Sequence, residues 1–268
     1  MTPREAAADA RTALFVPGTR PDRFGTALAA GADLVIADLE DAVADADKDT
    51  AREHVRDLLG GGDPVAVRIN AAGTPWYDAD VAMLRGHGAV VVLPKAETAE
   101  QVGALAAALP GAPLIPLVET AVGVLGAAEV CRAESVVRPA FGSVDLAAEL
   151  GVDHTDREAL RHARSALVLA AAAAGTAAPL DGVTTAVRDA ALLDADLRHA
   201  ARLGFTGKLC LHPAQLEPVR RGFAPSAEEL TWARAVVAAA GDGGVAVLDG
   251  RMVDKPVVER ARRLLRAG

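Results

Sequence analysis

Several features that define common protein classes are scarce in this chain. It has only two cysteines in 268 residues. Cys131 and Cys210 match no metal-binding spacing and are too few for a disulfide framework, which favours a reducing compartment. Aromatic residues make up only 3% and the net charge is −8. A base-stacking surface and general nucleic-acid binding are therefore not expected.

Long hydrophobic runs are also missing. Hydrophobic residues make up 51% of the chain, yet no stretch of about 20 apolar residues lacks a charge or a Gly/Pro interruption. The alanine-rich run at residues 167–178 is too short and too weakly apolar to span a bilayer. Residues 1–11 carry charges of both signs and no apolar core of a signal peptide. We expect a cytoplasmic protein that contacts no membrane.

The chain contains an alternation of short β-type runs and helix-type runs. The predicted strands are residues 13–18, 33–39, 64–70, 89–94, 113–119, 139–145, 179–183 and 207–212. The predicted helices between and after them are residues 23–30, 48–59, 78–85, 99–109, 157–174 and 189–203. Eight βα repeats whose strands are apolar on both faces predict an α/β fold, a (β/α)₈ TIM barrel. A doubly wound open sheet is the alternative, but residues 17–20 are not its glycine-rich fingerprint.

The chain continues beyond the eighth predicted strand. Residues 226–240 form another predicted helix, with Ser226 as N-cap and Glu229 at the capping-box position. Turns at residues 242–244 and 249–250 and a terminal helix from residue 256 follow. We therefore expect two parts: a barrel at 1–222, and a helical and hairpin extension at 223–268. A barrel does not need such an extension, so we interpret it as a lid and an oligomer contact.

Two carboxylates are the most informative residues. Glu119 ends the apolar run 113–119, and Asp145 ends the run 139–145. A charge at the end of a buried parallel strand lies at the rim of the core, where α/β proteins place their chemistry. Two oxygen donors at this rim favour a hard divalent cation, Mg²⁺, held partly by substrate and water.

Other polar residues follow predicted strands and would face the same mouth. They are Arg20, Glu40, Asp41, Arg68, Lys95, Glu97 and His212. Arg68 interrupts an apolar strand, so it must bind an anion or form an ion pair with Glu40 or Asp41. Arg20 follows a Pro-Gly turn that suits a carboxylate or phosphate clamp.

Three of these residues have open alternatives. Lys95 could act as a Schiff-base nucleophile, although a metal site is the competing way to stabilise an enolate. Glu97 could instead form an ordinary surface pair. His212 could be a hydrogen-bonded structural histidine.

A set of motifs occurs in a fixed order along the chain. They are LFVPGTRP (14–21), DLEDAV (38–43) with Lys48 and Arg52 behind it, VRIN (67–70), LPKAE (93–97), PLVET (116–120), FGSVDLA (141–147), GKLCLHP (207–213) and DGRMVD (249–254). In this order they resemble the citrate lyase β-subunit-like family of the HpcH/HpaI aldolase superfamily. The resemblance covers essentially the whole chain.

The resemblance implies a Mg²⁺-dependent barrel, commonly a homotrimer, that makes or breaks a carbon–carbon bond next to a CoA thioester. By this resemblance, Glu119 and Asp145 match the metal ligands. Arg68 matches the arginine that steadies the enolate and the keto-acid. Glu40 and Asp41 match the acidic pair that orders metal-bound water and Arg68.

The same resemblance implies roles for the remaining candidates. Arg20 matches a position that contacts substrate or CoA, and we group Lys95 with it as substrate- or CoA-binding. Asp254 and the basic positions Arg20 and Lys48 favour a CoA substrate over a CoA-independent one. Asp254 matches a tail aspartate that enters a neighbouring subunit's site as the acid or base.

The implied reaction cleaves or forms a 3-hydroxyacyl-CoA such as citryl-, malyl- or citramalyl-CoA. Its products would be an acyl-CoA and a keto-acid: oxaloacetate, glyoxylate or pyruvate. Alternatives are a thioesterase or malate-synthase-like activity at the same site, a CoA-independent pyruvate aldolase, a subunit active only in a larger citrate lyase complex, and a non-catalytic ligand-binding barrel.

Overall fold

The structure is a computed structural model that describes residues 1–240, 246–248 and 250–268. The chain divides into two compact units, Met1–Gly222 and Phe223–Gly268.

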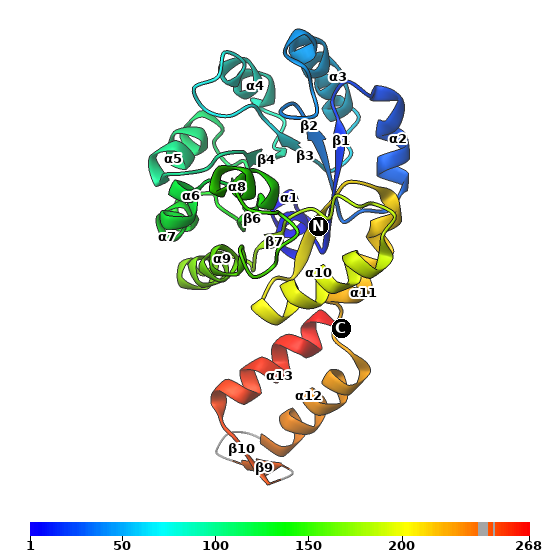
Figure 1. Ribbon diagram of the computed structural model, residues 1–268, viewed down its shortest axis with the longest axis vertical. Helices are drawn as coiled ribbons and strands as arrows, with labels where there is room; N and C mark the ends of the chain where they lie inside the picture. Colours follow the sequence, from blue (N-terminus) through cyan, green and yellow to red (C-terminus); the bar gives the residue numbers. More distant parts are fainter. Residues whose placement is uncertain (241–245, 249) are drawn as a thin grey trace. The chain divides into compact units, whose positions relative to one another are not determined.

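The first unit is a closed barrel of parallel strands, and this confirms the predicted (β/α)₈ fold (Figure 1). The strands follow chain order, and β1 pairs with β8 to close the barrel. They are β1 (Thr12–Pro17), β2 (Leu34–Asp38), β3 (Val65–Arg68), β4 (Val90–Leu93), β5 (Leu114–Val118), β6 (Ala140–Phe141), β7 (Leu180–Asp181) and β8 (Gly207–Cys210). Their residues are buried on both faces in nearly every case, as expected for parallel strands enclosed by helices.

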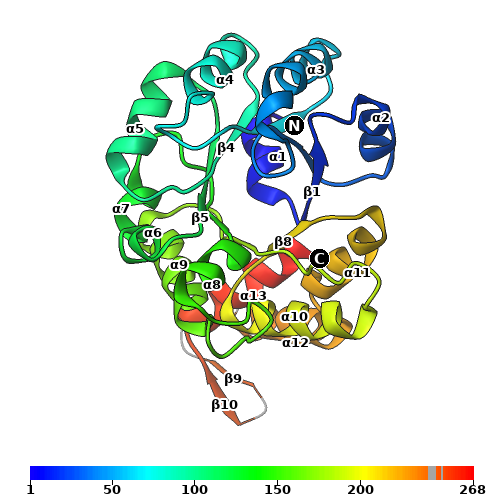
Figure 2. The same ribbon diagram turned by 45° about the horizontal axis from the view of Figure 1, so that its top comes forward.

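Apart from the first helix, which lies at one end of the barrel, the helices of this unit lie around the strands (Figures 1 and 2). They are α1 (Pro3–Asp9), α2 (Pro21–Ala29), α3 (Lys48–Gly60), α4 (Tyr77–Leu84), α5 (Ala99–Ala108), α6 (Ala121–Leu125), α7 (Ala127–Arg132), α8 (Ser143–Leu150), α9 (Arg161–Ala174), α10 (Ala190–Leu203) and α11 (Leu216–Phe223). Short 3₁₀ turns occupy Asp45–Asp47 and Pro213–Gln215.

Helix α1 was not expected from the sequence, and it packs on the N-terminal end of the barrel. Its Ala7 belongs to the same buried cluster as the inward residues of the strands. Arg138, which is fully buried, donates hydrogen bonds to the carbonyls of Ala8 and Ala10 at 3.1 and 2.7 Å. The last carbonyls of a helix attract a cation. Burial nevertheless lowers the pKa of Arg138 to about 9.

The prediction of the sixth strand is wrong at its C-terminal end. Strand β6 stops at Phe141, and Asp145 lies in the first turn of α8 rather than at the end of a strand. The chain passes close to Glu119 at this point: a Cβ at Gly142 would collide with the side chain of Glu119, so only glycine fits here. A carboxylate in the first turn of a helix is favoured by the helix dipole.

The expected helix at residues 157–174 also starts later, at Arg161. Before it, the Asp153 carboxylate accepts the amide of Thr155, and the Asp156 carboxylate accepts the amide of Glu158. Aspartate side chains that bond to nearby amides in this way compete with helix formation.

The second unit consists of α12 (Ala227–Ala240), a hairpin of β9 (Ala246–Leu248) and β10 (Arg251–Val253), and α13 (Lys255–Ala267). The capping box of Ser226 and Glu229 is confirmed. A small apolar core joins α12, β10 and α13. The predicted turn at residues 242–244 and the predicted turn residue 249 lie outside the described residues. None of the described helices is long and apolar enough to cross a membrane.

Candidate active site at the mouth of the barrel

A cavity of about 840 Å³ opens at the C-terminal end of the strands. Its walls come from β1, α2, the ends of β2 and β3, the loop after β2, the start of α8, and the loops after β7 and β8. Charged lining residues include Asp38, Asp41, Arg68 and Asp145. The C-terminal end of a (β/α)₈ barrel is the end that carries function.

Arg68 is held in place by Asp38, a residue that the sequence interpretation missed. Asp38 ends β2 directly beside Arg68 in the strand register. Its carboxylate accepts hydrogen bonds from Arg68 Nε and Nη2, both at 2.7 Å. The guanidinium also lies 4.8 Å from the centre of the Phe15 ring. A buried arginine in a strand needs a partner, and an aspartate ending the neighbouring strand was the available signal.

The third nitrogen of Arg68 faces the two acidic residues of the next loop. Arg68 Nη1 lies 3.0 Å from Glu40 Oε2 and 3.6 Å from Asp41 Oδ2. Burial works against the charge of Arg68, but Asp38, Glu40 and Asp41 outweigh it and raise the pKa of the guanidinium. The expected pairing of Arg68 with Glu40 and Asp41 is present, with Asp38 as the closest partner.

Glu40 is an under-compensated carboxylate. Its Oε2 atom is buried and accepts no hydrogen bond from any residue that the structure describes, although it lies close to Arg68. Burial raises the pKa of Glu40 to about 8; Arg68 opposes this shift, and the charges of Glu119 and Asp41 add to it. A further positive charge near Glu40 would therefore be stabilised by its carboxylate.

Glu119 and Asp145 lie on either side of the Lys95 ammonium. Glu119 follows β5 and is buried, and its Oε1 accepts the backbone N–H of Lys95 at 2.9 Å. Lys95 Nζ lies 3.3 Å from Asp145 Oδ1 and 3.8 Å from Glu119 Oε1. Burial raises the pKa of Glu119 to about 7, while Lys95 lowers it. The two carboxylates thus converge on one cationic position.

This donor set fits a magnesium ion. Glu119 and Asp145 supply only oxygen donors, which are the ligands that Mg²⁺ prefers. Among the described residues, no group of three or more His, Cys, Asp or Glu side chains is arranged to hold a metal. Two carboxylates are sufficient for Mg²⁺, because this ion usually takes its remaining ligands from substrate and water.

Two basic candidates are not brought to this cluster. Arg20 pairs with Asp22 on the exposed start of α2, at 2.9 and 2.7 Å. Lys48 is buried; its Nζ donates to the carbonyls of Leu39 and Glu40, both at 2.8 Å. The Lys48 ammonium is thus bound to the loop that carries Glu40, and the suggestion that this residue favours CoA stays a prediction.

Two other candidates, His212 and Asp254, each accept a hydrogen bond from a nearby backbone amide in the structure. His212 lines the cavity, and its Nδ1 accepts the amide of Ala214 as the cap of a 3₁₀ turn. Asp254 belongs to the second unit, where it caps α13 by accepting the amide of Val257 at 3.3 Å.

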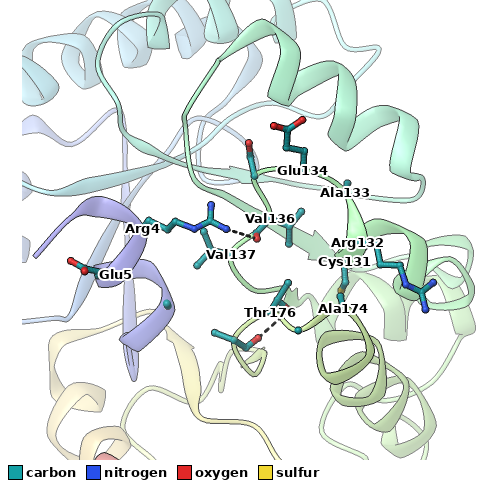
Figure 3. A pocket seen from close by; sticks show the side chains of 14 residues that line it. Arg4, Glu5, Cys131, Arg132, Ala133, Glu134, Val136, Val137, Ala174 and Thr176 are labelled. Atoms are coloured by element: carbon teal, nitrogen blue, oxygen red, sulfur yellow. Dashed lines mark hydrogen bonds between the residues drawn. The ribbon is translucent and has the colours of Figure 1, made fainter.

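A second cavity, of about 530 Å³, lies at the other end of the barrel (Figure 3). It is lined by residues of α1, the end of α7 and the segments that precede β6 and β7. Arg4 donates to the carbonyl of Val136 there, and Cys131 is buried, which raises the pKa of its thiol to about 11. The cavity shares no lining residue with the cavity of the candidate site. This end of a (β/α)₈ barrel usually serves stability.

The fold and the mouth define a (β/α)₈ barrel with an acidic pair suited to a divalent cation and a fixed arginine beside it. Residues 11–213 match the HpcH/HpaI aldolase/citrate lyase family, and the chain belongs to this family. It is 43% identical over 261 residues to the citrate lyase subunit beta-like protein of Mycobacterium tuberculosis, covering 94% of this chain and 93% of that protein.

Two further relatives are informative about chemistry. The chain is 37% identical to a (3S)-malyl-CoA thioesterase of Cereibacter sphaeroides over 266 residues, covering 95% of this chain and 93% of the relative. It is also similar to the crystal structure of the CitE protein of M. tuberculosis in complex with magnesium, acetoacetate and coenzyme A. The TM-score is 0.85 and the identity 40%, with 98% of each chain covered.

Proposed function

We propose that this protein is a Mg²⁺-dependent carbon–carbon lyase that cleaves, or forms, a 3-hydroxyacyl-CoA with a second carboxylate. Citryl-, malyl- and citramalyl-CoA are the candidate substrates. One observation carries the proposal: an arginine fixed by a buried aspartate lies at the same mouth as two carboxylates that converge on a cationic position. The CoA, acetoacetate and magnesium held by the CitE relative support it.

We assign binding of the metal to Glu119 and Asp145. A Mg²⁺ ion held there would act as a Lewis acid on the hydroxyl and carboxylate oxygens of the substrate. Glu119 is preorganised for this role, because the Lys95 amide and the close approach of Gly142 fix its side chain.

Arg68 is assigned to the anion that forms when the carbon–carbon bond breaks. Asp38 holds two of its nitrogens, so the remaining Nη1 edge has a fixed direction. A preorganised cation stabilises the oxygen of a thioester enolate, and loss of such a donor costs roughly 10²–10³ in rate. Glu40 and Asp41 keep this edge oriented through their charges.

We assign the proton transfer to Asp254 and a lid role to the extension. Cleavage leaves an enolate carbon that must gain a proton, and condensation must remove one. We place Asp254 in the site of a neighbouring subunit of a homotrimer, where the extension would also exclude water.

Two buried thiols, Cys131 and Cys210, agree with a reducing cytoplasm.

A thioesterase is the second candidate function, and the similarity to a (3S)-malyl-CoA thioesterase favours it. Both reactions use the same acyl-CoA substrate. They differ in the bond that breaks: a lyase releases a keto-acid and keeps the thioester, whereas a thioesterase releases the free thiol of CoA.

The test is a product balance with the purified chain alone. Citryl-, malyl- and citramalyl-CoA are each incubated with Mg²⁺ or with a chelator, and keto-acid and free thiol are measured together. We expect keto-acid without an equivalent of thiol, dependent on Mg²⁺, from at least one substrate. Thiol without keto-acid would establish the thioesterase instead. No product from any substrate would contradict the proposal for the isolated chain.

A further inference from the structure

We propose that Lys95 sets the affinity of the site for its metal ion, so that Mg²⁺ binds weakly alone and tightly together with an anionic ligand. This inference rests on the proposed function, because it takes Glu119 and Asp145 as the metal ligands. In this role Lys95 controls the affinity of the two carboxylates for the metal ion, and it need not bind CoA directly.

The first observation is the position of the ammonium. Lys95 Nζ lies within 4 Å of three carboxylates, at 3.3 Å from Asp145, 3.8 Å from Glu119 and 3.8 Å from Glu40. Two of these carboxylates are the assigned metal ligands. The ammonium thus competes for the oxygens that a divalent cation would use.

The second observation is that the backbone holds Lys95 in this place. Its φ is +48°, in the left-handed region that non-glycine residues rarely adopt. Among the described non-glycine residues, only Ser135 also has a positive φ. The Lys95 N–H donates to Glu119 Oε1 at 2.9 Å, so an assigned metal ligand fixes the strained residue. Strain of this kind persists where the surroundings impose it, and it clusters at functional sites.

The charges explain the coupling to an anion. Arg68 is already paired with Asp38, so Lys95 is the cation that directly faces the Glu119–Asp145 pair. A divalent ion bound to these carboxylates would be repelled by the ammonium at short range. The Lys95 side chain is 41% exposed, so its ammonium is able to leave the two carboxylates when a cation binds to them. The carboxylate of a bound keto-acid would give it a new partner.

The test is calorimetric titration with Mg²⁺, with and without pyruvate, for the wild type, Lys95→Met and Lys95→Arg. Methionine keeps the length of the side chain and removes its charge, whereas arginine keeps the charge. We expect Mg²⁺ alone to bind Lys95→Met at least tenfold more tightly than the wild type. Lys95→Arg should stay near the wild type. The tightening of Mg²⁺ binding by pyruvate should shrink in Lys95→Met by a similar factor.

Thermal unfolding provides a second readout. Without Mg²⁺, Lys95→Met should have a lower Tm than the wild type, because three carboxylates lose a shared cation. Saturating Mg²⁺ should restore more of the Tm in the variant than in the wild type. Lys95→Gln serves in place of the methionine variant if that protein does not fold.

The outcomes separate this inference from the proposed function. Equal or weaker Mg²⁺ binding in a folded Lys95→Met protein would overturn the inference, and the metal site would stand if the wild type still binds Mg²⁺. No binding of Mg²⁺ to any of the three proteins, with or without pyruvate, would overturn both.

Discussion

Replacing Asp38 with asparagine is the sharpest perturbation of the arginine at the mouth. The Asp38 side chain is 1% exposed, and each of its oxygens accepts two hydrogen bonds. Oδ1 accepts from Arg68 Nε and the Glu40 amide, at 2.7 and 3.0 Å. Oδ2 accepts from Arg68 Nη2 and the Ala42 amide, at 2.7 and 3.2 Å. The amide nitrogen of asparagine would therefore face two N–H donors.

The size of the effect follows from burial. Removing one partner of a buried ion pair costs about 3–5 kcal/mol, because the other charge stays uncompensated. A protein in the middle of the typical range of about 5–15 kcal/mol for the free energy of unfolding remains folded after such a loss. In the active site the variant releases both the guanidinium and the loop that carries Glu40. We therefore expect kcat/KM for keto-acid release to fall by about 10²–10³, the range for loss of one oriented donor.

Asp80→Asn is the matched control. Asp80 is also fully buried and accepts from Arg52 Nε at 2.7 Å and from the Asn70 side-chain amide at 2.6 Å, but it does not line the cavity of the candidate site. Urea unfolding should show comparable losses in the two variants, while only Asp38→Asn loses the rate. Equal rates in the two variants, after correction for the folded fraction, would refute the reasoning about Arg68.

Three further predictions concern other parts of the chain. Asp254→Asn should abolish carbon–carbon chemistry and leave Mg²⁺ binding near wild type, because asparagine caps a helix as well as aspartate does; full activity would refute the acid–base role. Burial opposes the charge of Asp181, but Lys208 and Arg164 outweigh it and lower its pKa below 3.8. Its stabilisation is therefore present above that pH and lost as the pH falls through the lower value; urea midpoints with the same acid dependence in Asp181→Asn would contradict this. Lys48→Met should lower kcat/KM by about 10–100-fold with partial rescue in Lys48→Arg, because the lysine holds two carbonyls of the Glu40 loop; a rate equal to wild type would exclude a positioning role.

The barrel was predictable because its signal is local and repeated. Each strand is a short apolar run, and parallel strands covered on both faces need no polar alternation. The residues that follow these runs meet at one mouth by topology alone. This is why the sequence predicts that Arg68, Glu40 and Glu119 are neighbours. Arg68 ends β3, whereas Glu40 and Glu119 follow β2 and β5.

The features that were missed depend on tertiary contacts. Asp38 lies inside the predicted strand 33–39, and only the register with β3 shows that it pairs with Arg68. Asp145 lies in the first turn of α8, and Gly142, which precedes this helix, packs against Glu119 of another segment. In the sequence Lys48 resembles a surface cation, whereas in the structure its ammonium is buried under the loop that carries Glu40. None of these constraints is visible in a run of neighbouring residues.

The most direct test of the central claim is Mg²⁺ binding by the two carboxylates. Calorimetric titration with Mg²⁺ in the presence of pyruvate is made on the wild type, Glu119→Ala, Asp145→Ala and the control Glu129→Ala, whose carboxylate is exposed on α7. We predict that the wild type and the control bind Mg²⁺ alike and that each of the two site variants loses the binding signal. Unchanged Mg²⁺ affinity in both site variants would contradict the assignment of the metal site.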